Sequence, residues 1–178
     1  MEEQPGNRKT YIVAACLSLL LVSIIIGVVI WGFMNSEPGY TMTKEEFPPA
    51  SMADFNAKIE QMVLKYTVRH EGDIPIVHPP ADSDIYLLAS TEGWGAYILE
   101  LEQGKPYQLK LASLDMTHTL AIRGLHLFNP ISLGELATIS FSPVASGRFT
   151  LQCGYICGPW HDSMNGSIIV VASPAAPL

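Results

Sequence analysis

The hydrophobic pattern of the chain begins with one uninterrupted apolar run. From Tyr11 to Met34 the sequence reads YIVAACLSLLLVSIIIGVVIWGFM, 24 residues without a charge. A helix needs about 20 apolar residues to cross the hydrocarbon core of a bilayer, whereas the apolar region of a cleaved signal peptide has only about 7–15. Residues 11–34 are therefore predicted to form a retained transmembrane helix.

The residues around this run predict its topology. Small residues precede Cys16, as in a lipoprotein signal, but most of the apolar run follows this cysteine instead of preceding it, so a retained anchor is favoured. Arg8 and Lys9 come just before the run, whereas Glu37 follows it. By the positive-inside tendency, residues 1–10 are expected in the cytoplasm and the rest of the chain outside the cell membrane.

A helical period appears next, in the part of the chain that follows the anchor. Residues 35–49 are polar and rich in proline, whereas residues 51–66 place apolar side chains three and four residues apart. This spacing predicts an amphipathic helix that packs on its own domain or on a neighbouring membrane subunit. Residues 69–84 contain Gly72 and three prolines and are predicted to form an irregular link. Residues 35–84 are thus interpreted as a juxtamembrane connector with one helix.

After this connector the period changes to two. Short alternating runs are separated by Gly, Pro, Asn and Asp, which is typical of an all-β sandwich or barrel. The predicted domain covers residues 85–173, with a tail at 174–178. Its candidate strands are Ile85–Ser90, Ala96–Leu101, Tyr107–Ala112, Thr117–Arg123, Leu136–Phe141, Arg148–Gln152 and Ser167–Ala172.

The charge balance narrows the class of partner. The sequence has 17 acidic and 10 basic side chains, a formal net charge of -7. Nucleic-acid binding depends largely on a basic surface, so the composition argues against it. A basic protein partner is favoured, with an association rate that falls as salt is added.

The most informative stretch lies between the last two predicted strands. Residues 152–166 read QCGYICGPWHDSMNG, in which Cys153, Cys157, His161 and Met164 form a C-x3-C-x3-H-x2-M pattern. Thiolate, imidazole and thioether together suit copper in electron-transfer sites. One cysteine would serve a single copper ion, and a second in the same loop allows two thiolates to bridge two metal ions.

Two questions about this loop stay open at this point. A second imidazole must come from a neighbouring strand, and His118, at the start of a predicted strand, is favoured over His126. In an oxidising exterior, Cys153 and Cys157 could instead form a disulfide. That alternative would leave His161 and Met164 at ligand spacing without a reason.

With these residues in view, the segments DMTHTLAI and SGRFTLQCGYICGPWHDSMNGSIIVV resemble the copper-binding domain of cytochrome c oxidase subunit II. The resemblance covers roughly residues 85–173 and implies a cupredoxin-like Greek-key sandwich. It also implies a dinuclear copper A centre with two copper ions. By matching positions, the ligands would be His118, Cys153, the backbone carbonyl of Tyr155, Cys157, His161 and Met164.

The sequence departs from the family pattern in two places. Many family members have a glutamate where Tyr155 stands, and its carboxylate helps to hold a magnesium ion, so no magnesium site is expected here. The chain has one predicted membrane helix where the commoner subunit II has two. Both departures make it similar to the compact, single-helix branch of the family.

The resemblance implies an electron-transfer role within an oxidoreductase complex. Such a subunit takes electrons from cytochrome c and passes them to haem in the haem-copper catalytic subunit, where oxygen is reduced. Similar subunits occur in some nitric oxide reductases, which is the first alternative. The others are a membrane-anchored copper-delivery or thiol redox protein, and a structural subunit that has lost copper. We find no catalytic motif in the chain itself.

Three further residues are candidates for supporting roles. Trp94 and Trp160 are aromatic side chains near predicted turns, and aromatic residues are favoured at the centres of interfaces. They are predicted to help dock the electron donor, although core packing is an equal alternative for Trp94. Asp162, next to His161, could accept a hydrogen bond from a ligand or face water.

Overall fold

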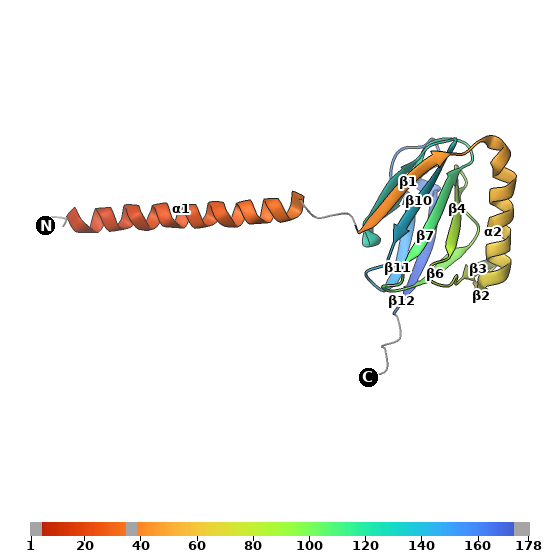
Figure 1. Ribbon diagram of the computed structural model, residues 1–178, viewed down its shortest axis with the longest axis horizontal. Helices are drawn as coiled ribbons and strands as arrows, with labels where there is room; N and C mark the ends of the chain where they lie inside the picture. The colour runs from red at the N-terminus through yellow and green to blue at the C-terminus, as the bar shows by residue number, and fades with distance from the viewer. Residues whose placement is uncertain (1–4, 35–38, 173–178) are drawn as a thin grey trace. The chain divides into compact units, whose positions relative to one another are not determined.

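The computed structural model describes residues 5–34 and 39–172. The chain divides into two compact units, Met1–Pro38 and Gly39–Leu178, which are described separately. The first contains helix α1 (Pro5–Met34), within which Thr10–Gly32 is long and apolar enough to cross a membrane (Figure 1). The helix predicted at residues 11–34 is therefore present, and it starts at Pro5, a residue that suits the first turn because it lacks an N–H.

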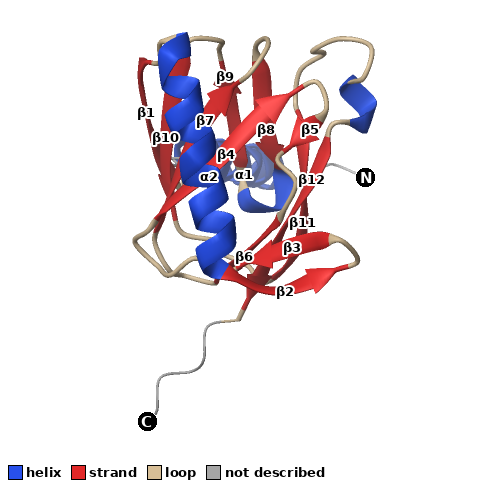
Figure 2. Cartoon of the chain, turned by 90° about the vertical axis from the view of Figure 1, so that its right-hand side faces the viewer, coloured by secondary structure: helices blue, strands red, loops and turns tan. Residues whose placement is uncertain are grey.

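The second unit contains two β-sheets (Figures 1 and 2). The first sheet has the order β1 (Tyr40–Glu46), β10 (Glu135–Phe141), β7 (Tyr107–Ser113), β4 (Asp84–Ser90) and β5 (Gly93–Trp94). The second has the order β2 (Thr67–Glu71), β3 (Ile74–Val77), β6 (Ile98–Glu102), β12 (Asn165–Val171), β11 (Gly147–Cys153), β8 (His118–Ile122) and β9 (Leu127–Ile131).

The hydrophobic core of this unit is built from buried side chains of both sheets. In β4, Ile85, Leu87 and Ala89 are at most 1% exposed, while the residues between them are half-buried. This alternation follows from the pleat, which points successive side chains to opposite faces. All seven strands predicted from the period of two are present, with ends shifted by at most two residues.

Helix α2 (Met52–Tyr66) lies beside the first sheet (Figure 2). Its Phe55 packs edge-to-face against Phe47 and against Tyr86 of β4, with ring centroids 5.5 Å apart in both pairs. Phe55 and Met62 are buried, whereas Leu64 on the opposite side of the helix is exposed. Of the two surfaces predicted for this helix, it therefore packs on its own domain.

The helix predicted within the connector is present as α2, but residues 35–49 and 69–84, interpreted as a polar connector and an irregular link, contain three strands in the part that the structure describes. β1 pairs with β10, and β2 and β3 form a hairpin that joins the second sheet. Strand β1 is polar and almost wholly exposed. It is stabilised by backbone pairing with β10 and not by burial of its side chains, so its sequence has no alternation of apolar and polar residues. Residues 35–38 of the connector and the predicted tail at 174–178 lie outside the described residues.

The described residues of this unit also form three short 3-10 helices: η1 (Pro49–Ser51), η2 (Arg123–Leu125) and η3 (His161–Ser163). Strand β9 was also missed by the period of two. It contains Pro130 and forms the edge of the second sheet, which is where proline is tolerated in a strand. The structure thus confirms an all-β sandwich accompanied by one long apolar helix, and adds α2, β1 and the β2–β3 hairpin to the sandwich.

Candidate metal centre

The register of the second sheet brings His118 and Cys153 together. Cys153, the last residue of β11, lies opposite Leu120 of β8. His118 comes two residues before Leu120, and residues two apart in a strand point to the same face. The Thr119 N–H donates to Cys153 Sγ at 3.5 Å, and the Gly154 N–H donates to the Thr119 carbonyl at 2.7 Å. The start of the ligand loop is therefore fixed to β8.

The rest of the loop turns back on itself through η3. Gly158 has φ +121°, a conformation that favours glycine, and its carbonyl accepts the N–H of His161 at 3.2 Å. The His161 carbonyl in turn accepts the N–H of Met164 at 3.2 Å. These backbone bonds return His161 and Met164 to the neighbourhood of Cys157.

The donor atoms fall into two groups, one around each sulfur. Cys153 Sγ lies 4.0 Å from His118 Nδ1 and 3.0 Å from the Tyr155 carbonyl oxygen. Cys157 Sγ lies 3.7 Å from His161 Nδ1 and 3.8 Å from Met164 Sδ. The donor atoms of His118, Cys153 and Cys157 lie within 4.8 Å of one another. The six residues named from the sequence thus converge at one place.

The spacing and chemistry of these donors fit soft metal ions. Metal–sulfur and metal–nitrogen bonds of about 2.3 Å and 2.0 Å at a tetrahedral centre place the two donors about 3.5 Å apart. The two sulfur-to-nitrogen distances, 4.0 Å and 3.7 Å, are close to that value. Thiolate, imidazole and thioether are the donors that copper favours. His118, Cys153, Cys157 and Met164 are at most 6% exposed, so water is largely excluded.

The two cysteines in this structure are free thiols, not a disulfide. Burial and the neighbouring Cys153 raise the pKa of the Cys157 thiol to about 11. A bound metal needs the thiolate, so binding must release the thiol proton. The site is therefore expected to bind metal more weakly as the pH falls.

Asp115, which the sequence analysis did not single out as a supporting residue, contacts one of the candidate ligands. Its Oδ1 lies 2.8 Å from His118 Nε2, and its carboxylate also accepts the N–H groups of Thr91 and Met116 at 2.8 Å. Burial opposes ionisation of Asp115, but the hydrogen bonds from His118, Thr91 and Met116 outweigh it and lower its pKa to about 2. A signal was available, because an acidic residue stands three positions before a candidate histidine ligand.

The other predicted supporting residues have different positions. Trp94 is 1% exposed, and its ring lies edge-on to His118 with centroids 6.4 Å apart, so of the two positions left open for it, core packing is the one observed, and not the docking surface. Trp160 is 68% exposed. Asp162 is exposed, and in the described residues only its backbone oxygen has a recorded bond, from Asn165. His126, the rival of His118, is exposed in a turn and outside the donor group.

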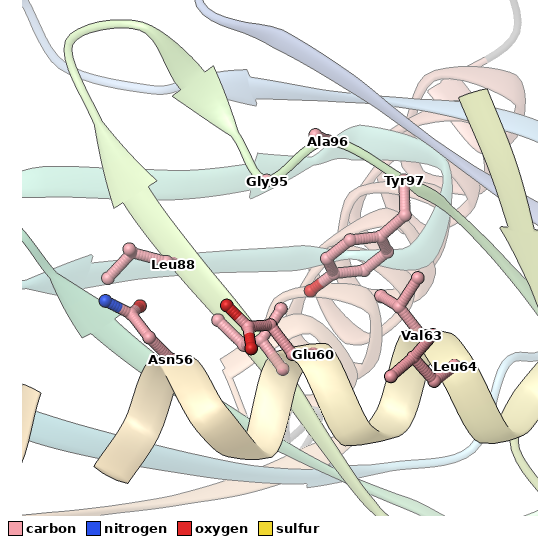
Figure 3. Close-up of a pocket in the computed structure, with 9 residues that line it drawn as sticks. Asn56, Glu60, Val63, Leu64, Leu88, Gly95, Ala96 and Tyr97 are labelled. Carbon is pink, nitrogen blue, oxygen red and sulfur yellow. The ribbon is translucent and has the colours of Figure 1, made fainter. Parts of the chain in front are cut away.

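A second concave region lies between α2 and the segment Gly95–Tyr97 (Figure 3). It is lined mainly by apolar side chains, including Val63, Leu64 and Leu88, and Glu60 is its one charged lining residue. None of the candidate ligands lines this groove.

Comparison with known proteins agrees with the resemblance. No protein-family model matches the chain. Two curated relatives from Thermus thermophilus, both named cytochrome c oxidase subunit 2, are 29% identical over 112 residues. The alignment covers 58% of this chain and 82% and 66% of the two relatives. The predicted similarity to cytochrome c oxidase subunit II is thereby confirmed.

Two solved structures are also similar to this chain. One is a haem-copper terminal oxidase dimer, with 18% identity, a TM-score of 0.48 and coverage of 93% of this chain and 99% of that one. The other is the periplasmic domain of subunit II of the cytochrome oxidase of Bradyrhizobium japonicum. It has 20% identity, a TM-score of 0.47 and coverage of 53% and 87%.

Proposed function

Because the chain is similar to cytochrome c oxidase subunit II, we propose that it is the electron-accepting subunit of a membrane haem-copper oxidase. In this role it takes electrons from cytochrome c and passes them to haem in the catalytic subunit, where oxygen is reduced. The observation that carries the proposal is the division of the donors into two groups, each with one cysteine sulfur and one imidazole nitrogen 4.0 Å or 3.7 Å apart.

The proposed ligands form a dinuclear copper A centre. His118, His161, Met164 and the Tyr155 carbonyl would be the terminal ligands of the two copper ions, and the thiolates of Cys153 and Cys157 would bridge them. Bound there, two copper ions supply one-electron transfer. The Tyr155 side chain is 70% exposed while its carbonyl oxygen lies 3.0 Å from Cys153 Sγ, so the side chain is free to vary.

The protein itself would contribute by restricting the movement of the ligands and by excluding water from the centre. His118 and Cys153 belong to paired strands, which limits their movement between oxidation states. Burial of both sulfurs and of Met164 excludes water, and that lowers the reorganisation that accompanies each electron. These properties favour fast transfer over chemistry at the site.

The exposed side of the ligand loop suits a docking partner. Tyr155, Ile156 and Trp160 are each between 68% and 76% exposed, and Phe128, whose ring lies against Gly154, is 60% exposed. Large uncharged side chains grouped over a redox site favour short-range apolar contact with a partner. We place the donor contact here, with Trp160 as its central residue, while the net charge of -7 steers a basic donor from a distance.

Helix α1 would anchor the subunit in the cell membrane as a single pass. Arg8 and Lys9 precede its apolar part, which favours a cytoplasmic N-terminus and a domain outside the membrane. This topology puts the ligand loop in the compartment of a soluble or tethered cytochrome c.

Purification of the tagged full-length chain from its native membranes tests the proposal. We expect a haem protein to copurify, and the complex to consume oxygen when reduced cytochrome c is supplied. The double variant Cys153→Ser/Cys157→Ser should keep the haem partner but lose reduction by cytochrome c. Absence of a haem partner, or full activity of the double variant, would refute the proposal. Consumption of nitric oxide in place of oxygen would identify a nitric oxide reductase.

A further inference from the structure

We infer that Asp115 is a positioning residue that ties the β4–β5 loop to the His118 half of the metal centre and sets its reduction potential. The inference rests on the proposed dinuclear copper site and concerns how the protein tunes that site.

The carboxylate of Asp115 accepts hydrogen bonds from three residues. Oδ1 receives the His118 Nε2–H and the Met116 N–H, both at 2.8 Å, and Oδ2 receives the Thr91 N–H at 2.8 Å. Thr91 follows β4 of the first sheet, whereas His118 begins β8 of the second. One side chain thus joins a loop of one sheet to a ligand on the other.

The same loop contacts His118 on another side. Trp94, in β5, is buried and lies edge-on to the His118 ring, with centroids 6.4 Å apart. Trp94 pairs with Ala89 of β4, so its place depends on the same short β4–β5 hairpin that presents Thr91. The His118 ring is therefore restrained by a carboxylate and by an indole, both tied to this hairpin.

This arrangement fixes the chemical form of His118. A carboxylate at Nε2 favours the tautomer that carries its proton there, which leaves the lone pair on Nδ1, the atom 4.0 Å from Cys153 Sγ. In the part of the chain that the structure describes, no carboxylate is recorded at the ring of His161, which is half-buried. The His118 ring is therefore held by a carboxylate, whereas the His161 ring has no such contact among the described residues.

The negative charge of Asp115 should also shift the reduction potential of the centre in one direction. The oxidised centre carries one more positive charge than the reduced centre, and a nearby carboxylate stabilises the more positive state. Removal of that charge should raise the reduction potential. Loss of the fixed ring should also change the electronic coupling of His118 to its copper ion.

The test compares variants of the copper-loaded full-length chain in detergent, by potentiometric titration and by the histidine nitrogen couplings in electron nuclear double resonance. Asp115→Asn should raise the potential and alter the couplings of one histidine. Asp115→Glu, which keeps the charge but displaces the carboxylate, should alter the couplings with a smaller rise. Asp162→Asn is the matched control, because it removes a charge next to His161 without a recorded side-chain bond to a ligand. It should move the potential less and leave both couplings unchanged.

The outcomes separate two failures. If the wild-type chain binds two copper ions and Asp115→Asn behaves like Asp162→Asn in both measurements, the inference is wrong while the proposed function stands. If the wild-type chain does not bind two copper ions, the proposed function fails and the inference fails with it. Loss of copper from Asp115→Asn, with an unchanged thermal midpoint of the metal-free protein, would support positioning.

Discussion

The two halves of the candidate metal centre are built in different ways. The His118 half is held by strands: His118 is fully buried, Cys153 pairs across β8 and β11, and Asp115 secures the ring from outside. The His161 half is held by a loop, through the turn at Gly158 and the 3-10 helix η3, and His161 is partly exposed. Long-range pairing thus makes one half rigid, and local turn chemistry makes the other half accessible. Under the proposed function, this division would suit a site that must hold its ligands in place and also be accessible to an electron donor.

Replacement of the cysteines should have the largest effect on copper binding, because it removes the sulfur atoms that are proposed to bridge the two copper ions. Either Cys153→Ser or Cys157→Ser should abolish the dinuclear copper spectrum. Visible absorption and electron paramagnetic resonance of the purified chain measure this result. Cys16→Ser, in α1, is the control and should leave the spectrum intact. A dinuclear spectrum that survives either loop substitution would show that the thiolates do not bridge.

Replacement of the two histidines should distinguish the halves from each other. His118→Gly and His161→Gly should each reduce copper affinity by more than about 10-fold, since changes outside the ligands themselves typically cost 10–100-fold. Added imidazole should restore the spectrum of His161→Gly, because that site is open to solvent. It should restore His118→Gly poorly, because that position is buried.

The matched control for this pair is His126→Gly. His126 is exposed and lies outside the donor group, so the substitution should leave copper binding unchanged. Equal rescue of both ligand variants would remove the contrast between a buried and an accessible half.

Met164 offers a finer test of the loop-held half. Met164→Leu conserves volume, and such swaps usually cost less than about 1.5 kcal/mol. The variant should keep both copper ions but shift the reduction potential, because a weak thioether ligand tunes the potential. Met62→Leu, a buried methionine of α2, should not shift it. An unchanged potential in Met164→Leu would exclude Met164 as a ligand.

The smallest expected effect concerns the stability of the second sheet, which contains His118 and Cys153. Glu100 of β6 is paired with Arg69 of β2, with His78 Nδ1 3.4 Å away, and the hydrogen bond from Arg69 lowers the Glu100 pKa despite the opposing effect of burial. A depressed carboxyl pKa gives stability that is present above the unfolded value of about 4.3 and lost as the pH falls through the lower folded value.

Glu100→Gln should therefore reduce the free energy of unfolding by about 2 kcal/mol at pH 7, a typical value for hydrogen bonds to charged groups. The difference from wild type should shrink as the pH falls below about 4. Denaturant unfolding of the metal-free chain between pH 7 and pH 3 measures it. Glu135→Gln, which breaks the ion pair of a more exposed carboxylate with Lys44, should cost less than Glu100→Gln. If the difference in the free energy of unfolding between wild type and Glu100→Gln did not change with pH, the ionised Glu100 carboxylate would not be its source.

The sequence predicted the loop-held half better than the strand-held half, for a physical reason. Cys157, His161 and Met164 lie within eight residues, so their spacing alone indicates that they converge. Asp115 stands three residues before His118, which was a usable signal, but its contact with Thr91 of the β4–β5 loop joins residues far apart in the sequence and leaves no local pattern. For Trp94 the sequence left a docking surface and core packing equally open, because a turn does not show to which side its side chains point, and in the structure the indole lies in the core against His118.

Edge strands were the other weakness of the sequence prediction. β1 and β2 are polar and exposed, and they are stabilised by pairing with β10 and β3, so no alternation of apolar residues marks them. Strands β4, β10 and β12, by contrast, alternate buried and less buried residues along most of their length.

The metal content and electron paramagnetic resonance spectrum of the wild-type full-length chain, purified from its native membrane, test the central claim most directly. The account predicts two copper ions per chain and a spectrum in which one unpaired electron is shared between them. One copper ion or none, together with a disulfide between Cys153 and Cys157, would contradict it.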